Sequence, residues 1–235
     1  MTAADIIAEI EPLGLESYRK VIRNHGVVDP LFGVKIEELK KIQKRIKKDY
    51  KLALDLYDTG IYDAQYLAGL IADDLKMTKA DLQHWLETAN SHVVTESTVA
   101  WVAAESYHGA EVAMEWIESD NEIAAATGWA TLNGLVAIKK DNELDVAELK
   151  RLLGKVASTI HEQPNRVRRC MNSFVIAVGT YVKELTETAI ETAGQIGKVY
   201  VDVGATSCKV PSAAEYIEKS RQRGSIGKKR STIKC

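Results

Sequence analysis

A basic segment near the N-terminus contains the densest group of side chains able to bind an anion. The stretch from Phe32 to Lys48 carries seven lysine and arginine residues. Its apolar residues Ile36, Leu39 and Ile42 recur at helical spacing, so one helix face would pack on a core while the opposite face carries the cations. A cationic face of this kind is most often simply solvated, and the alternative is that it binds an anion such as phosphate.

Two further basic clusters have the same potential. The stretch from Asn165 to Phe174 contains three arginines, Arg166, Arg168 and Arg169. Guanidinium groups near a helix N-terminus suit phosphate, because the helix dipole and the N–H donors act together. The alternative is ion pairing with acidic helices that precede the cluster. The stretch from 219 to 234 adds seven basic residues without an acidic one.

The familiar signatures of nucleotide binding and hydrolysis are missing from the sequence. It has no glycine-rich phosphate loop, HExxH, GxSxG or zinc-type Cys/His cluster. The five histidines are scattered, which is typical of surface or interhelical residues rather than metal ligands. We therefore expect no metal and no cofactor.

The composition predicts a folded intracellular protein. The 235 residues are 46% hydrophobic, with a formal net charge of -2, enough for a sizeable core and too near neutral for indiscriminate binding of polyanions. The three cysteines are widely separated, so they predict neither a disulfide framework nor a metal pair. The first ten residues do not resemble a leader, and no stretch reaches the roughly 18 apolar residues of a membrane span. We expect a cytoplasmic monomer that makes no membrane contact.

The positioning elements are predicted to be helices almost throughout. Helical periodicity and sparse proline predict helices at 3–11, 14–24, 35–48, 51–58, 61–73, 79–88, 94–105, 110–118, 121–139, 145–161, 165–182 and 184–196. Thr78 followed by Asp81 predicts a capping box, and Gly60, Gly109 and Gly197 are predicted to end helices. Many short helices with short connections are typical of an all-α right-handed solenoid of HEAT-like antiparallel pairs; a helical bundle without a repeat is the alternative.

The last residues follow a different pattern. Valines alternate with other residues from Val199 to Val203 and a glycine follows, which predicts an extended segment or a small hairpin arm. Ser212 is predicted to cap a short helix that ends near Arg221. The basic end is expected to be either flexible or strapped to the protein. We therefore predict a helical repeat domain at 1–197 and an arm, a short helix and a basic tail at 198–235.

Three segments carry a family resemblance. They are Phe32-Gly-Val with the basic helix after it, Ala68-Gly-Leu-Ile-Ala-Asp-Asp74, and Ala177-Val-Gly179. In their order and spacing they resemble the DNA alkylation repair family of HEAT-like alkylpurine glycosylases, over roughly residues 5 to 196. The resemblance implies a solenoid that cradles double-stranded DNA and excises cationic N3- or N7-alkylated purines without a metal.

The resemblance also locates a candidate active site. Family members with this activity carry a Trp and, four residues later, an Asp after the Ala-Gly-Leu segment, where this chain has Asn90-Ser-His-Val-Val-Thr-Glu96. His92 then takes the aromatic position and Glu96 the position of the catalytic carboxylate. A glutamate adds a methylene and displaces the carboxylate by about an ångström, which matters where positioning dominates.

Other family features are missing. The arginine that the family places near Ala124 to Gly128 and its second tryptophan at Thr180 have no counterpart here. Trp101 and Trp129 are the nearby aromatic candidates to line a lesion site, although tryptophans at helical spacing are usually core residues. The residues predicted to contact the DNA backbone are cations from all three basic clusters: Lys40, Lys44, Arg166, Arg168, Arg169, Lys228, Lys229 and Arg230.

Three functional hypotheses follow from these observations. The chain is a DNA glycosylase that uses Glu96, a non-catalytic relative that recognises DNA structure, or a helical scaffold that binds protein. The altered cleft residues favour DNA binding without catalysis over excision.

Overall fold

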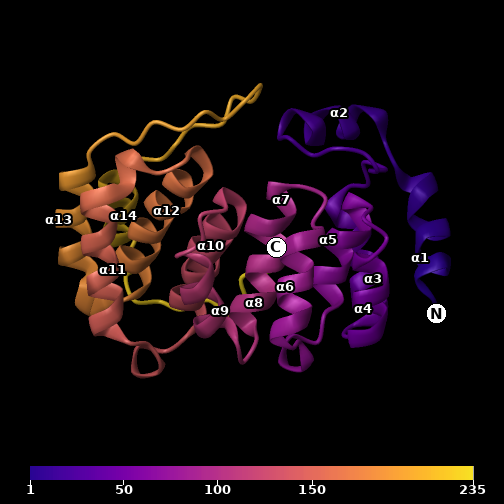
Figure 1. Cartoon of the computed structure of the whole chain (residues 1–235), viewed down its shortest axis with the longest axis horizontal. Helices are drawn as coiled ribbons and strands as arrows, with labels where there is room; N and C mark the ends of the chain where they lie inside the picture. The colour runs from indigo at the N-terminus through magenta and orange to yellow at the C-terminus, as the bar shows by residue number, and fades with distance from the viewer. Residues whose placement is uncertain (235) are drawn as a thin grey trace. The chain divides into compact units, whose positions relative to one another are not determined.

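The structure is a computed structural model that describes residues 1–234, and its regular elements are all helical (Figure 1). No strand occurs in this part of the chain, so the predicted all-α class is confirmed. The contacts divide the chain into two compact units: unit 1 comprises residues 1–108, 203–207 and 234, and unit 2 comprises 109–202 and 208–233. The domain boundary at residue 197 stays a prediction. None of the described helices is long and apolar enough to span a bilayer.

Unit 1 contains the first half of the helices. They are α1 (Ala3–Ile10), α2 (Glu16–Asn24), α3 (Ile36–Ile46), α4 (Tyr50–Tyr57), α5 (Tyr62–Ile71), α6 (Lys79–Thr88), α7 (His92–Val94), a π-helical segment η3 (Thr95–Val99) and α8 (Ala100–Glu105), with short 3-10 turns η1 (Glu11–Leu13) and η2 (Asp74–Lys76). Helix α5 is buried from Asp63 to Ile71. It packs against α3, α4 and η3, which makes it the central element of this unit.

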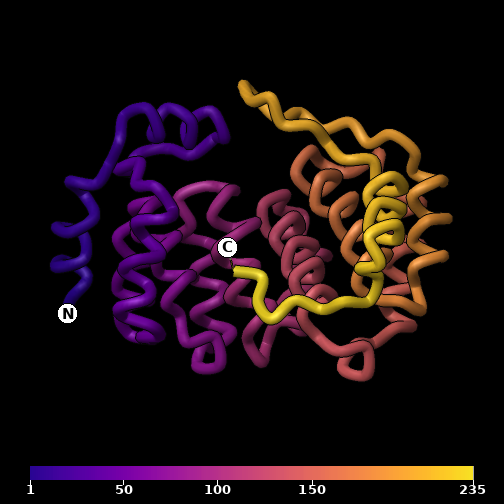
Figure 2. Tube along the Cα trace, turned by 180° about the vertical axis from the view of Figure 1, so that it is seen from behind, coloured from indigo at the N-terminus to yellow at the C-terminus, as the bar shows by residue number. Residues whose placement is uncertain are grey.

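Unit 2 contains the longer helices. They are α9 (Gly109–Trp116), α10 (Glu122–Ile138), α11 (Val146–Thr159), α12 (Asn165–Tyr181), α13 (Thr186–Ile196) and α14 (Ala213–Gln222), with 3-10 turns η4 (Asp141–Glu143), η5 (Ile160–Glu162) and η6 (Lys183–Leu185). Helix α12 packs against α10, α13 and α14. Figure 2 shows α14 lying beside α12 and α13 after the extended arm that joins α13 to α14.

Most predicted helices are found within a few residues of their expected bounds. The helix expected at 35–48 ends early, at Ile46, because Lys47 adopts a left-handed conformation with φ 67°. The prediction for Gly109 is wrong, since this glycine begins α9 rather than ending a helix. The preceding helix stops at Glu105, and the hydroxyl of Ser106 donates to the carbonyl of Ala103 (2.7 Å).

The predicted capping box at the start of α6 is confirmed. The Thr78 hydroxyl oxygen accepts from the Asp81 N–H, and the Asp81 carboxylate accepts from the Thr78 N–H and hydroxyl. The Tyr50 hydroxyl donates to the same carboxylate (2.8 Å). Partial burial raises the pKa of Asp81, but the hydrogen bonds from Thr78 and Tyr50 together hold that pKa below its usual value.

The Phe32-Gly-Val segment is held by one buried carboxylate. Asp63, in the first turn of α5, has 0% exposure and accepts backbone N–H bonds from Phe32 (2.6 Å), Gly33 (3.3 Å) and Val34 (2.7 Å). Three donors satisfy a charge that would otherwise be costly to bury. This carboxylate therefore fixes the entry into α3 and the register of α3 against α5.

The glycine of the Ala68-Gly-Leu segment permits a close helix contact. A Cβ on Gly69 would lie 2.4 Å from Cγ2 of Thr98, a distance at which the helices would have to separate. The Thr98 side chain belongs to η3, so the small residue lets α5 and the π-helical segment touch. Gly179 has the same role in unit 2, where an added Cβ would lie 2.5 Å from Cδ1 of Ile217 in α14.

The basic tail is strapped to the protein rather than flexible. In unit 2, the Lys229 ammonium donates to the carbonyl of Val136 (2.9 Å), and the Arg230 N–H donates to the carbonyl of Ala137 (2.8 Å). Ile233 is buried. In unit 1, the Lys234 ammonium pairs with the carboxylate of Asp74. The tail residues therefore contribute to the folded structure of both units.

Candidate functional site

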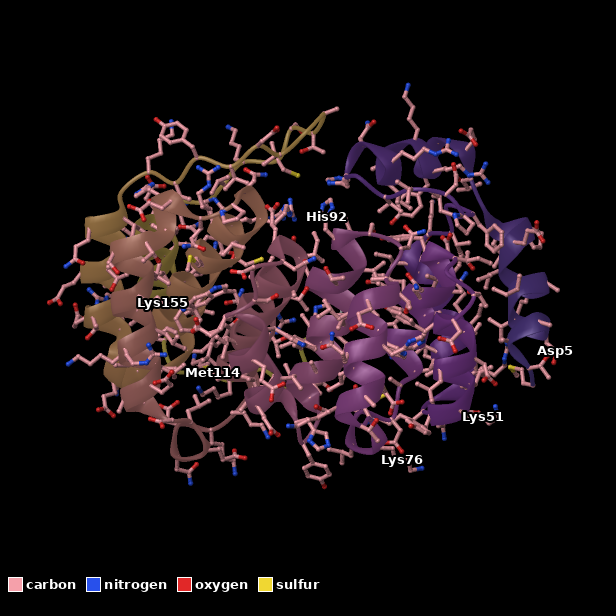
Figure 3. The ribbon with its side chains drawn as sticks, viewed as in Figure 1. Asp5, Lys51, Lys76, His92, Met114 and Lys155 are labelled. Atoms are coloured by element: carbon pink, nitrogen blue, oxygen red, sulfur yellow. The ribbon has the colours of Figure 1, made fainter. Side chains whose placement is uncertain are left out.

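The segment that contains His92 and Glu96 lies in unit 1. His92 begins α7, and its ring packs against the chain at the end of α2, since a Cβ on Gly26 would lie 2.7 Å from Cε1 of His92. Figure 3 labels His92 beside that end of α2. Gly26 has φ 87°, a conformation that a larger residue adopts only with strain. The contact between His92 and α2 therefore depends on glycine.

Two neutral amides position this segment. The Gln65 side chain, fully buried in α5, donates to the carbonyls of Tyr57 (3.2 Å) and Thr88 (3.0 Å) and accepts from the Asn90 N–H (2.8 Å). The Asn90 side chain donates to the carbonyls of Val28 (3.0 Å) and Gly60 (3.2 Å). These bonds join the loop after α2, the start of α5 and the residues before α7. They therefore fix the position of the backbone that leads into His92.

Glu96 lies on the π-helical segment one turn after His92. Both side chains are half-buried and both have interaction partners in the structure. A π-helical turn adds one residue to the local repeat and is frequent at functional sites. Here the π-helical segment that carries the candidate carboxylate packs against α5, where Gly69 meets Thr98. A half-buried carboxylate in this position is chemically able to stabilise a developing cation.

The two predicted tryptophans have different environments. Trp101, in α8, is half-buried and makes an edge contact with Tyr66, with ring centroids 5.6 Å apart. Tyr66 in turn contacts Tyr62, which places three aromatic rings in one row of unit 1. Trp129 has 0% exposure and packs against Phe174 in the core of unit 2, with centroids 5.1 Å apart. The structure thus places Trp129 in a core, where a base cannot stack on it.

The cations of α3 divide into paired and unpaired groups. Arg45 pairs with Glu9 (2.6 Å) and Lys41 with Glu38 (2.7 Å). Lys40 and Lys44, which share one helix face, make no ion pair in the described part of the chain. The positive charges of these two lysines, which are predicted to contact DNA, are therefore not neutralised by a carboxylate in the described part of the chain.

Two of the three arginines at the start of α12, Arg168 and Arg169, also lack an ion pair in the described part of the chain. The Arg166 N–H donates to Glu122 Oε1 (2.6 Å), which joins the first turns of α10 and α12 in unit 2. Arg169 is exposed, and neither it nor Arg168 forms an ion pair within residues 1–234. The buried Nε of Arg168 has no hydrogen-bond acceptor there. The expected alternative, pairing with preceding acidic helices, does not apply to these two guanidinium groups.

The cations of the tail differ in whether they have an anionic partner. Lys228 and Arg230 are exposed and have no carboxylate partner within the described residues. The Lys229 ammonium pairs with Asp141 (2.8 Å) in addition to its bond to Val136. Of the three tail residues predicted to contact DNA, Lys229 already has an anionic partner.

The residues that position the site were missed by sequence reasoning. Gln65 and Asp63 are polar residues inside an otherwise apolar run, Tyr62-Asp-Ala-Gln-Tyr66. Polar side chains in a fully buried helix need partners, so their presence in this run was the available signal. Apart from Tyr57, their partners lie more than 20 residues away along the chain, which a local pattern does not reveal.

The chain resembles known proteins over almost its whole length. The family model described as DNA alkylation repair enzyme matches residues 6–217. Uncharacterised proteins of Listeria innocua serovar 6a and Listeria monocytogenes serovar 1/2a are each 34% identical over 229 residues, covering 95% of this chain and 99% of theirs.

A solved structure matches all of this chain and all of its own, with a TM-score of 0.92 and 34% identity. It is described as belonging to a new family of proteins related to the HEAT-like repeat DNA glycosylases, with affinity for branched DNA structures. The predicted HEAT-like fold is confirmed by this match.

Proposed function

Because the chain belongs to the DNA alkylation repair enzyme family, we propose that it binds double-stranded DNA and prefers branched duplexes to linear ones. The affinity of the solved relative for branched DNA structures supports this function, since the two chains are 34% identical over their full lengths. We expect the protein to act as a cytoplasmic monomer.

The availability of Arg168 and Arg169 is the observation that carries the proposal. Both lie in the first turns of α12, and neither has an anionic partner in residues 1–234. A guanidinium that is partly desolvated and unpaired gains more from a phosphate than a solvated one does. The first turn of a helix also presents N–H dipoles that favour an anion. A DNA phosphate satisfies both conditions.

The test is a binding titration of the purified chain against a four-way junction, a forked duplex and a linear duplex of equal length. Affinity should fall steeply with salt. Arg168→Gln combined with Arg169→Gln should weaken junction binding about 30- to 100-fold at low salt and lower the salt slope by about 2.

A matched control removes two arginines whose charges are already paired. Arg151 pairs with Glu148 (2.7 Å), and Arg221 pairs with Glu187 and Glu218 in the same unit. Changing both to Gln alters the net charge equally and should change affinity less than threefold. Equal losses in the two double variants would show only a dependence on net charge. Absence of duplex binding at low salt would overturn the proposal.

Excision of alkylated purines is the second candidate function, and the position of Glu96 on the π-helical segment favours it. Cleavage of the N-glycosidic bond develops positive charge on the sugar, which a nearby carboxylate stabilises. A cationic N3- or N7-alkylated purine leaves as a neutral base, so the reaction needs little acid catalysis. The half-buried position of Glu96 would strengthen such an electrostatic effect.

The assay measures release of methylated purine from alkylated duplex. Glu96→Gln should lower release at least about 100-fold while leaving junction affinity unchanged. Glu87→Gln, which changes an exposed residue of α6 in the same unit, serves as the control and should retain activity. A wild-type chain that binds the alkylated duplex but releases no base would exclude excision and leave DNA binding as the function.

A further inference from the structure

A hollow in unit 2 lies beside α12, because the Asn172 amide donates to the carbonyl of its lining residue Pro211 (3.0 Å). It has a volume of about 720 Å³, is open to solvent, and is lined by the end of α13, the two limbs of the arm at 198–201 and 209–211, and the first turn of α14. This volume falls within the range of about 300–1,000 Å³ typical of ligand clefts. Figure 2 shows the arm that connects α13 to α14.

The walls of the hollow are mainly aliphatic. Val199, Val210 and Pro211 line it together with alanines of α13 and α14. Val199 is buried, whereas Val210 is half-buried and Pro211 is exposed. Apolar surface left in contact with water in a concave site favours an apolar occupant.

Two lysines give the rim a positive charge. Lys198 and Lys209 both line the hollow, and neither has a carboxylate partner within residues 1–234. The one acidic residue of the lining, Glu215, lies in the first turn of α14 and pairs with neither lysine. The dipole of α14, a helix of 10 residues, adds positive potential at this end. An occupant with carboxylates therefore complements the rim.

The lining favours a peptide over a nucleic acid strand. Unspecific strand binding relies on open aromatic faces for base stacking, and Tyr200 is the aromatic residue at this hollow. The Lys198 ammonium lies 4.7 Å from the centre of its ring, so a cation already covers one face. The remaining contacts are aliphatic, which suits the side chains of leucine, isoleucine or phenylalanine.

We infer that this hollow binds a short extended peptide of another protein in which large apolar side chains alternate with acidic ones. The apolar side chains fill the space against Val199 and Val210, and the carboxylates pair with Lys198 and Lys209.

The test uses the full chain and labelled eight-residue probes in fluorescence anisotropy. The first probe alternates aspartate with leucine and phenylalanine, the second replaces every apolar residue with serine, and the third replaces aspartate with lysine. The first probe should bind at least tenfold more tightly than either of the others. Equal binding of the serine probe would overturn the inference, because it would show charge attraction without a docking site.

Substitutions of residues that line the hollow test whether the first probe binds there. Lys198→Glu with Lys209→Glu, and separately Val210→Asp, should each weaken the first probe at least tenfold. Lys150→Glu with Lys219→Glu is the control, because both lysines are exposed in unit 2 and lie outside the hollow. Far-UV circular dichroism verifies that each variant is folded. A control pair that weakens the probe as much as the hollow variants would contradict the assignment.

A competition experiment separates the two classes of partner. An eight-nucleotide single-stranded DNA should not displace the first probe, and Arg168→Gln with Arg169→Gln should leave probe binding unchanged. Displacement by the oligonucleotide that depends on Lys198 and Lys209 would instead make the hollow a nucleic-acid surface and refute the peptide.

Discussion

Replacement of Asp63 by alanine removes the acceptor of three backbone N–H groups in one step. Two of the donors, on Gly33 and Val34, are buried and the third, on Phe32, is half-buried. A buried donor without a partner costs about 1–3 kcal/mol. Removal of the carboxylate also removes the free-energy cost of burying its charge, which offsets part of the loss. The expected net decrease in unfolding free energy of unit 1 is about 3–5 kcal/mol.

The assay is thermal unfolding followed by circular dichroism, with hydrogen exchange of individual amides as a local readout. A decrease of 3–5 kcal/mol corresponds to a fall in Tm of roughly 10–15 °C for a chain of this size. The amides of Phe32, Gly33 and Val34 should lose protection before the rest of unit 1.

The matched control is Asp55→Ala, which removes an exposed aspartate of the same unit whose ion pair with Lys51 is on the surface. It should lower Tm by no more than about 2 °C, because exposed pairs contribute little. An Asp63→Ala variant as stable as this control would refute the reasoning, since water would then satisfy the three donors.

Three further predictions concern stability. Gly69→Ala should lower Tm by about 4–10 °C because of overpacking, whereas Gly194→Ala, where an added Cβ meets open space, should hold or slightly raise it. Lys234→Met should lower the unfolding free energy, measured in urea, by about 1–3 kcal/mol, because Asp74 is buried and loses one of its two lysine partners; an unchanged midpoint would show that the tail is dispensable for folding. The lowered pKa of Asp81 stabilises the fold, and this contribution is fully present above the unfolded value near 3.8. The stability difference between wild type and Asp81→Asn should therefore be constant at neutral pH and decrease as pH falls from 3.8 through the lower pKa of the folded state.

Local patterns were sufficient for the helices and their caps. The capping box of α6 is formed by residues three positions apart, so the sequence contains all of it. The failure at Gly109 has a local cause as well, because glycine ends helices by adopting a left-handed conformation and also occurs at helix starts. A sequence pattern does not distinguish these two positions when the helices are separated by only a few residues.

The candidate site was less predictable because its parts are joined by long-range contacts. The Phe32-Gly-Val segment was recognised as a motif, whereas its cause, the Asp63 carboxylate, lies about 30 residues further along the chain. The charge of α3 was visible, but Arg45 pairs with Glu9 of α1, so only tertiary structure shows which cations remain available. The core position of Trp129 likewise depends on Phe174 of another helix.

The positioning of His92 and Glu96 by Gln65 and Asn90 has a consequence for measurement. Carboxamides do not titrate and are not screened by salt, so the geometry they maintain should be the same across the range of pH and ionic strength used in DNA-binding experiments. The affinity for DNA can therefore change with salt while the geometry of this segment stays the same. A change of binding with salt then reports on phosphate contacts and not on a displacement of this segment.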